Sequence, residues 1–380
     1  MSNLSSIQLL QKLIEFDTTS HKSNLALISY VKNLLESKGI SIFLNSNAEQ
    51  TKANLFATIG PKDRAGILLS GHTDVVPVEG QAWSSNPFQA LIKDHKIYGR
   101  GTADMKGFIA CAIHAMIKAV DLPQLNKPLH LCLSYDEEIG CIGVRGILGL
   151  LSEYIIQPEL CIIGEPTSMN IATGHKGKAV FKAICHGQEG HSALAPLYVN
   201  AIHNAQSLIE AIRTTQKEIA EGSILDTDYD VPFSTVHIGK IHGGKALNIV
   251  PNECILDYEI RNIAEQTTDA IQEKIFNYIE QSPSAKFVNI QEINQYPGLD
   301  TSTTIQAVKF LQSLLKPETE LQKISFGTEG GLFQQQLNTA VLVCGPGSIQ
   351  VAHKPDEYIE ISQMDECDAF FERLLNHIAA

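Results

Sequence analysis

Histidines and acidic residues follow several short apolar runs of this sequence. The runs span residues 67–70, 129–135, 160–163 and 341–344. After them, or after the glycine-rich stretch 99–101, come His72, Asp74, Asp104, Glu137, Glu138, Glu165 and His353. Carboxylates that converge in one crevice would repel one another and resist ionisation. A bound cation would remove this repulsion, so the pattern indicates a metal site.

The types of these residues indicate which metal chemistry they could support. Two imidazoles and several carboxylates, without a thiolate, suit Zn²⁺, Co²⁺ or Mn²⁺ rather than a structural cysteine site. The set is too large for one tetrahedral ion and fits two ions that share a bridging carboxylate. Asp74 follows His72 by two residues on the same strand face, where it could fix the tautomer of that histidine.

Each of these residues also has an ordinary structural explanation. His72 could be a hydrogen-bonded histidine at a strand end, and Asp104 could cap the helix that follows it. The pair Glu137–Glu138 could be a solvated turn, while Glu165 and His353 could lie in surface loops. These separate explanations would all have to apply to residues that follow strands, and such a coincidence is improbable. We therefore favour a common metal site.

The elements that must position these residues alternate along the chain. Apolar residues at helical spacing predict an amphipathic helix over 24–38, and a second helix, buried on most faces, is expected over 105–119. The four apolar runs read as buried strands. Strands that alternate with helices predict an α/β sheet covered on both sides. The carboxyl ends of such strands form a ligand crevice, so the candidate residues are expected to converge there.

The pattern changes between about residues 176 and 292. Candidate strands span 179–184, 235–241, 254–260 and 287–293, and helical stretches lie near 199–217 and 266–281. The order β, α, β, β, α, β is the ferredoxin-like split pattern. We therefore expect an α+β domain at 176–292, inserted into an α/β domain made of residues 1–175 and 293–380.

Composition excludes several classes of protein. The 29 Lys and Arg against 42 Asp and Glu give a net charge of −13, and no cationic run is present, which argues against a nucleic-acid binder. No apolar run reaches the roughly 18 residues of a membrane span, and the N-terminus lacks the pattern of a signal peptide. Eight scattered cysteines without a CxxC pair predict buried reduced thiols and a cytoplasmic protein.

Six motifs occur in order along almost the whole chain. They are His72-Thr73-Asp74, the run Gly99 to Gly107, Asp136-Glu137-Glu138, Gly164-Glu165-Pro166-Thr167, Gly190-His191-Ser192 and the run Ala352 to Glu357. Together they resemble the M20 family of two-metal amidohydrolases and peptidases. One His-x-Asp triplet would be weak evidence, whereas six ordered motifs are strong evidence.

The resemblance implies a fold and a set of metal ligands. The fold would be a zinc-peptidase-like α/β catalytic domain with an inserted ferredoxin-like α+β domain that serves as lid and dimerisation domain. Asp104 would bridge two divalent ions, Zn²⁺ or Co²⁺, with Mn²⁺ as a further candidate. His72 and Glu165 would complete one metal site, and Glu138 and His353 the other.

The resemblance also assigns catalytic roles. Glu137, beside a ligand but not itself one, would be the general base that moves a proton from water to the leaving nitrogen. Asp74 would orient His72. His191 would stabilise the oxyanion, and in dimeric members of the family the partner subunit supplies this histidine. The alternative for His191 is a loop histidine without such a role.

Three further residues are candidates for contact with the substrate. Asn248 and Arg261 resemble substrate-contacting positions of the family, and arginine suits a bidentate grip on an α-carboxylate. Arg261 could instead be a solvated charge at a strand end. Glu329, in the glycine-rich segment 327–331, is expected to lie near the substrate and to favour its side-chain ammonium. The alternative is that Glu329 caps or solvates the start of the next helix.

The expected activity is metal-dependent hydrolysis of N-acetyl-L-ornithine to ornithine and acetate, in arginine biosynthesis. Succinyl-diaminopimelate or another acyl amino acid is the alternative substrate. A metal-binding regulatory module without catalysis is a further alternative, which the presence of Glu137 disfavours. The expected partner is a second copy of the chain, bound through residues 176–292, and neither a nucleic acid nor a membrane.

Overall fold

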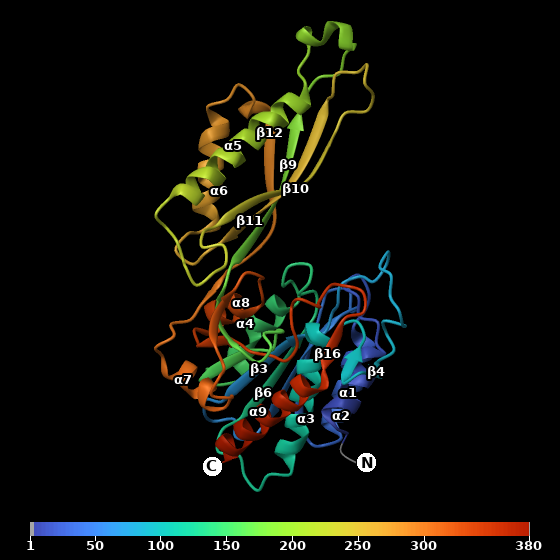
Figure 1. Cartoon of the computed structure of the whole chain (residues 1–380), viewed down its shortest axis with the longest axis vertical. Helices are drawn as coiled ribbons and strands as arrows, with labels where there is room; N and C mark the ends of the chain where they lie inside the picture. The colour runs from blue at the N-terminus through green and yellow to red at the C-terminus, as the bar shows by residue number, and fades with distance from the viewer. Residues whose placement is uncertain (1–3, 380) are drawn as a thin grey trace. The chain divides into compact units, whose positions relative to one another are not determined.

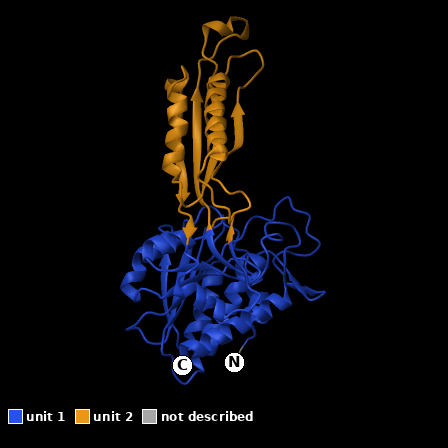
Figure 2. Ribbon diagram, turned by 60° about the vertical axis from the view of Figure 1, so that its left-hand side comes forward, with its two compact units in different colours: residues 1–174, 301–322, 328–380 blue, residues 175–300, 323–327 orange. Residues whose placement is uncertain are grey.

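The computed structural model describes residues 4–379 of the chain. These residues form two compact units, shown in different colours in Figure 2. Among the described residues, unit 1 comprises 4–174, 301–322 and 328–379, and unit 2 comprises 175–300 and 323–327. Within the described residues, no helix has the length and apolar character that crossing a bilayer requires.

A mixed β-sheet forms the centre of unit 1. Its strands follow the order β1-β2-β6-β3-β7-β15-β8, and β14 also pairs with β8. Their bounds are β1 Ser41–Ser46, β2 Ala53–Ile59, β3 Ile67–His72, β6 Leu129–Ser134, β7 Leu160–Ile163, β8 Ile171–His175, β14 Leu321–Ile324 and β15 Val341–Val343. The neighbours β6, β3, β7 and β15 are parallel, so their carboxyl ends meet at one edge of the sheet.

Helices bury these central strands. The helices of unit 1 are α1 Ser6–Ile14, α2 Leu25–Glu36, α3 Gly107–Val120, α4 Val144–Tyr154, α7 Gln306–Ser313, α8 Gly330–Leu337 and α9 Ile361–Ala379. Figure 1 shows α3 beside α1 and α9, and both of these helices contact it. Every residue of β3 and β6 is buried, so the sheet is covered on both faces, as the apolar runs predict.

Two short features complete unit 1. A small antiparallel sheet joins β16 (Tyr358–Glu360), β5 (Lys96–Tyr98) and β4 (Leu91–Lys93). A π-helical turn, η1 (Thr102–Lys106), precedes α3, whereas the sequence predicted that the helix begins at residue 105. The short strand β13 (Leu299–Asp300) lies in the segment 175–300, which is assigned to unit 2.

Unit 2 is an antiparallel sheet with helices in the order βαββαβ. Its elements are β9 Gly177–His186, η2 Ser192–Leu197, α5 Ala201–Glu221, β10 Thr235–Gly243, β11 Glu253–Asn262, α6 Thr268–Glu280, η3 Ala285–Phe287 and β12 Val288–Tyr296. The strands lie in the order β10-β11-β9-β12. Alternate residues of β9 are buried, and they share one hydrophobic core with α5 and α6.

The expected limits of the insertion differ from those of unit 2. The expected boundary at residue 293 falls inside β12, and unit 2 continues to Asp300. Unit 2 also contains residues 323–327, which sequence patterning did not assign to it. A register shift between Glu292 and Asn294 interrupts the strand pattern at this point, which explains why the strand was expected to end too early.

Candidate metal centre

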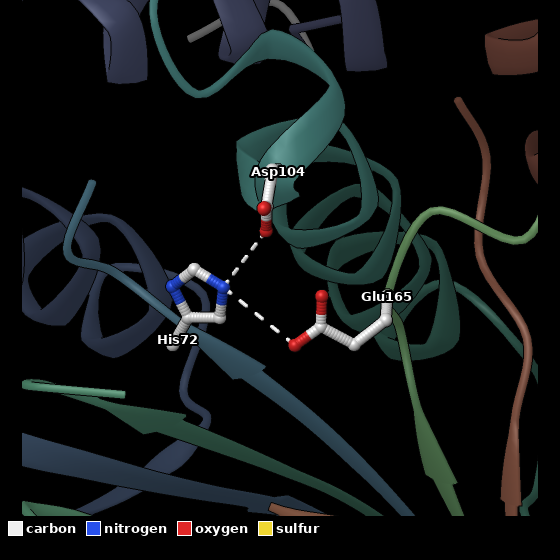
Figure 3. A group of neighbouring side chains, drawn as sticks. All are labelled: His72, Asp104 and Glu165. Carbon is white, nitrogen blue, oxygen red and sulfur yellow. Dashed lines mark hydrogen bonds and ion pairs between the residues drawn. The ribbon is translucent and has the colours of Figure 1, made fainter. Parts of the chain in front are cut away.

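The first group of candidate ligands lies at the carboxyl edge of the central sheet. His72 ends β3, Glu165 follows β7, and Asp104 lies in η1 (Figure 3). The Nε2 atom of His72 is 3.0 Å from Asp104 Oδ1 and 3.6 Å from Glu165 Oε1. All three side chains are buried, and their facing atoms are close enough to hold one metal ion.

A second group shares Asp104 with the first. The Nε2 atom of His353 is 3.2 Å from Asp104 Oδ2 and 3.1 Å from Glu138 Oε2. The two oxygens of Asp104 therefore face two different histidines, Oδ1 towards His72 and Oδ2 towards His353. This is the arrangement that a carboxylate bridging two cations requires.

Unusual backbone conformations bring Asp104 and His353 to this edge. Asp104 has φ −123° and ψ 91° within η1, and His353 has a positive φ of 62°. Gly101 has φ 84°, and a Cβ atom there would lie 2.8 Å from Val75 Cγ1, so only glycine fits this turn. The candidate ligands thus come from regular strand ends and from two loops of irregular backbone.

The electrostatics of the two groups favour cation binding. Burial raises the pKa of Glu165 well above its usual range and raises that of Glu138 to about 6. Burial opposes the ionisation of Asp104, yet hydrogen bonds from His353 and His72 hold its pKa below the usual range. A hydrogen bond to Asp104, and then one to Glu138, raises the pKa of His353 to about 10. Three carboxyl groups thus share a buried space, where a divalent ion would neutralise the excess negative charge.

Comparison with known proteins places this geometry in a family. The pattern of peptidase family M20/M25/M40 matches residues 68–377. The chain belongs to this family. An acetylornithine deacetylase from Myxococcus xanthus is 33% identical over 379 residues, which cover 97% of this chain and 96% of that protein.

Solved structures of the family share the fold. The M20 family metallo-carboxypeptidase Sso-CP2 from Sulfolobus solfataricus aligns with a TM-score of 0.82 at 20% identity and covers 98% of this chain and 99% of that one. A dinuclear metal-binding M20 peptidase from Bacillus subtilis aligns with a TM-score of 0.72 at 14% identity, covering 98% and 97%. The expected fold class is confirmed, and the chain is a metal-dependent hydrolase of amide bonds.

Asp74 contacts both His72 and the turn at Glu137 and Glu138. The Nδ1 atom of His72 donates to the backbone oxygen of Asp74 at 2.9 Å, and the Asp74 carboxylate lies farther away, at 3.6 Å. This carboxylate accepts the backbone N–H of Glu137 at 3.1 Å and that of Glu138 at 3.3 Å. Asp74 therefore fixes the turn that carries the candidate base and a candidate ligand.

Sequence reasoning missed the residues that hold Asp74. The hydroxyl of Ser20, which is 5% exposed, donates to Asp74 Oδ2 at 2.8 Å. Lys52 donates to the backbone oxygen of Ser20 and, at 2.5 Å, to Asp136 Oδ1. A serine in an N-terminal loop has no periodicity or motif to distinguish it, so only the three-dimensional structure reveals this contact.

Glu137 lies beside the ligands but belongs to neither candidate group. It is half-buried, and burial raises its pKa well above the usual range. The thiol of Cys141 donates to its Oε1 atom at 3.4 Å. All eight cysteines are free and buried, which confirms the reduced thiols expected from the sequence.

Glu329 is buried directly before α8. Its side chain is 1% exposed, and Oε2 accepts a hydrogen bond from Ser70 at 3.5 Å. Burial raises its pKa to about 7, and it makes no side-chain cap to α8. The charges of His72 and Asp74 also act on its carboxyl group and shift its pKa, so Glu329 lies near the candidate metal centre. This burial does not fit solvation of the helix start, whereas contact of Glu329 with a substrate stays a prediction.

The remaining candidates lie in unit 2. His191 and Asn248 are exposed and belong to adjacent segments, since Ser192 N donates to Asn248 O at 3.1 Å. Arg261 is the penultimate residue of β11, and its Nε atom is 3.1 Å from Glu259 Oε1 while its Nη1 atom is 3.4 Å from the Tyr296 hydroxyl. Within unit 2, the structure thus brings His191 close to Asn248.

Proposed function

We propose that this enzyme hydrolyses N-acetyl-L-ornithine to L-ornithine and acetate, a step of arginine biosynthesis in the cytoplasm. The bridging geometry of Asp104 supports a two-metal amidohydrolase. The choice of substrate is supported by 33% identity to the Myxococcus xanthus acetylornithine deacetylase over 97% of the chain. A succinyl-diaminopimelate or another acyl amino acid remains the competing substrate in the test below.

The donor set fits two divalent ions, and we assign them as Zn²⁺ or Co²⁺, with Mn²⁺ as a further candidate, because the groups offer only imidazole and carboxylate ligands. His72, Asp104 and Glu165 would hold one ion. Asp104, Glu138 and His353 would hold the other. When bound, such ions polarise the amide carbonyl and acidify water.

Glu137 is assigned the proton transfer. Its Oε1 atom accepts the Cys141 thiol, which leaves Oε2 to take a proton from the attacking water. The same atom then delivers this proton to the amide nitrogen as the carbon–nitrogen bond breaks, so that acetate and a free amine result. A general base of this kind contributes roughly 10² to 10⁴ in rate. Asp74 holds Glu137 in place through the backbone.

Residues of unit 2 are assigned to recognition. The Nδ1 atom of His191 accepts the Ala193 N–H at 3.1 Å, so a neutral ring carries its proton on Nε2 and can donate to an oxyanion. Arg261 is assigned to the substrate carboxylate, with Glu259 fixing the orientation of its guanidinium. Asn248, exposed beside the His191 segment, is assigned as an additional polar contact.

We also propose that two copies associate through unit 2, with His191 serving the partner's site. The edge strands β10 and β12 support this, because unpaired sheet edges favour pairing with another chain. Light scattering at micromolar concentration measures the oligomeric state. A stable monomer with full activity would contradict the dimer.

The decisive experiment compares substrates and variants. Metal-loaded protein is assayed with N-acetylornithine, succinyl-diaminopimelate and N-acetylmethionine, and the first is expected to show the highest kcat/KM. Glu137→Gln should retain its metal content while kcat falls at least 100-fold, whereas His72→Ala should lose metal. Near-normal turnover of metal-loaded Glu137→Gln would refute the mechanism, and preference for another acyl group would refute the substrate.

A further inference from the structure

A buried ion pair joins the loops that carry Asp104 and His353. Arg100 and Glu357 are each 1% exposed and lie 257 residues apart, with Arg100 Nη1 2.6 Å from Glu357 Oε2. Arg100 precedes Asp104 by four residues, and Glu357 follows His353 by four. The pair therefore connects the loop of the shared ligand to the loop of the most exposed ligand.

Glu357 binds the backbone of the Asp104 loop directly. Its Oε2 atom also accepts Gly101 N at 3.1 Å, and its Oε1 atom accepts Ala103 N at 2.9 Å and Asp104 N at 3.2 Å. These N–H groups belong to a turn whose conformation is not helical at Asp104. One carboxylate thus supplies the acceptors for this turn and fixes the backbone of the bridging ligand.

Arg100 reaches the His353 loop from the other side. Its Nη1 atom donates to Lys354 O at 3.3 Å, and its Nη2 atom donates to Gln81 Oε1 at 2.6 Å. Gln81 in turn donates through Nε2 to His353 O at 2.9 Å. The side chain of His353 is 50% exposed, so packing restrains it little and these backbone contacts decide where the loop lies.

We propose that Arg100, Glu357 and Gln81 are positioning residues that set the distance between Asp104 and His353, and that Gln81 thereby tunes the affinity of the second metal group alone. The inference rests on the proposed two-metal centre. Selectivity follows from the contacts: Gln81 holds His353, which belongs only to the second group, whereas Glu357 holds Asp104, which belongs to both.

The test measures metal affinity rather than turnover. Metal-free protein is titrated with Co²⁺ by calorimetry, and the binding event that His353→Ala abolishes is assigned to the second group. In Gln81→Met, the second ion should bind about tenfold more weakly, while the affinity for the first ion stays within twofold of the parent. Glu357→Gln should weaken both ions.

A matched control distinguishes loss of the His353 position from a general loss of stability. Gln363 is a half-buried glutamine whose Oε1 atom accepts Gly347 N at 3.3 Å and holds neither loop ligand. Gln363→Met should leave both Co²⁺ affinities unchanged, and its metal-free melting temperature should match that of Gln81→Met. Unchanged affinity for the second ion in Gln81→Met, or equal loss for both ions, would overturn the inference. If the parent binds a single ion, the two-metal proposal fails as well.

Discussion

The hydrogen bond from Ser20 to Asp74 allows a sharp test of how the base is positioned. Ser20→Ala removes one of the three groups that donate to the Asp74 carboxylate, the others being the N–H groups of Glu137 and Glu138. A hydrogen bond to a charged group contributes about 1.5 to 3 kcal/mol. Because Asp74 is only 2% exposed, water does not readily replace the lost donor, and the free energy of unfolding should fall by about this amount.

Part of the interaction energy lost in Ser20→Ala should also lower the catalytic efficiency. Without Ser20 Oγ, the Asp74 carboxylate gains freedom to rotate away from Glu137 N and Glu138 N. If about half of the interaction energy, about 0.75 to 1.5 kcal/mol, is lost from the positioning of Glu137, kcat/KM should fall about 3- to 10-fold, since 1.4 kcal/mol corresponds to one decade. The bound metal should remain, because no ligand is removed.

Thr18→Val is the matched control. The Thr18 hydroxyl donates to the backbone oxygen of Thr73 at 2.6 Å and is equally buried, but it does not contact Asp74. Urea unfolding measures stability, and steady-state kinetics with N-acetylornithine measure kcat/KM. The Thr18 variant should lose about 1 kcal/mol of stability with near-normal activity. If Ser20→Ala loses no more activity than Thr18→Val, Asp74 does not act through Glu137 as argued here.

Two further predictions concern pH and metal. Burial lowers the pKa of His130 to about 4, so the unfolded chain takes up a proton below pH 6.5 while the folded one does not. The free energy of unfolding should therefore fall by up to about 3 kcal/mol between pH 6.5 and 4. In His130→Gln, urea titrations at several pH values should show a smaller dependence of this free energy on pH. An unchanged pH dependence would refute the lowered pKa of His130 as its cause. Chelation should lower the melting temperature measured by calorimetry, because an ion at 1,000 times its Kd stabilises the fold by about 4 kcal/mol; Co²⁺ should restore it, and an unaltered melting temperature would contradict a metal centre in the native fold.

The positions of the candidate ligands at strand ends were predictable, because they follow from the local sequence pattern and from one rule of sheet topology. Buried apolar runs identify β3, β6 and β7, and parallel pairing brings their carboxyl ends together. His72 and Glu165 lie where that rule predicts. In β9, buried and half-buried residues alternate because only one face of the sheet packs against the helices.

Other features depend on contacts between distant residues, which local patterns do not encode. The helix expected from residue 105 begins at Gly107, because Glu357 supplies acceptors for the N–H groups of a non-helical turn. The burial of Glu329 depends on the short turn before α8 and on Ser70 of β3. In both cases a partner more than 250 residues away decides the local conformation.

The two metal groups are held by different means, and this difference has a physical consequence. His72 and Glu165 are buried, so packing and strand pairing restrain them. Glu138 and His353 are less buried and depend on backbone contacts, from Glu138 N to Asp74 and from Gln81 to His353 O. Ligands restrained by few contacts cost more entropy to order around an ion. The second group should therefore be the weaker one, and its occupancy should depend on residues that touch no metal.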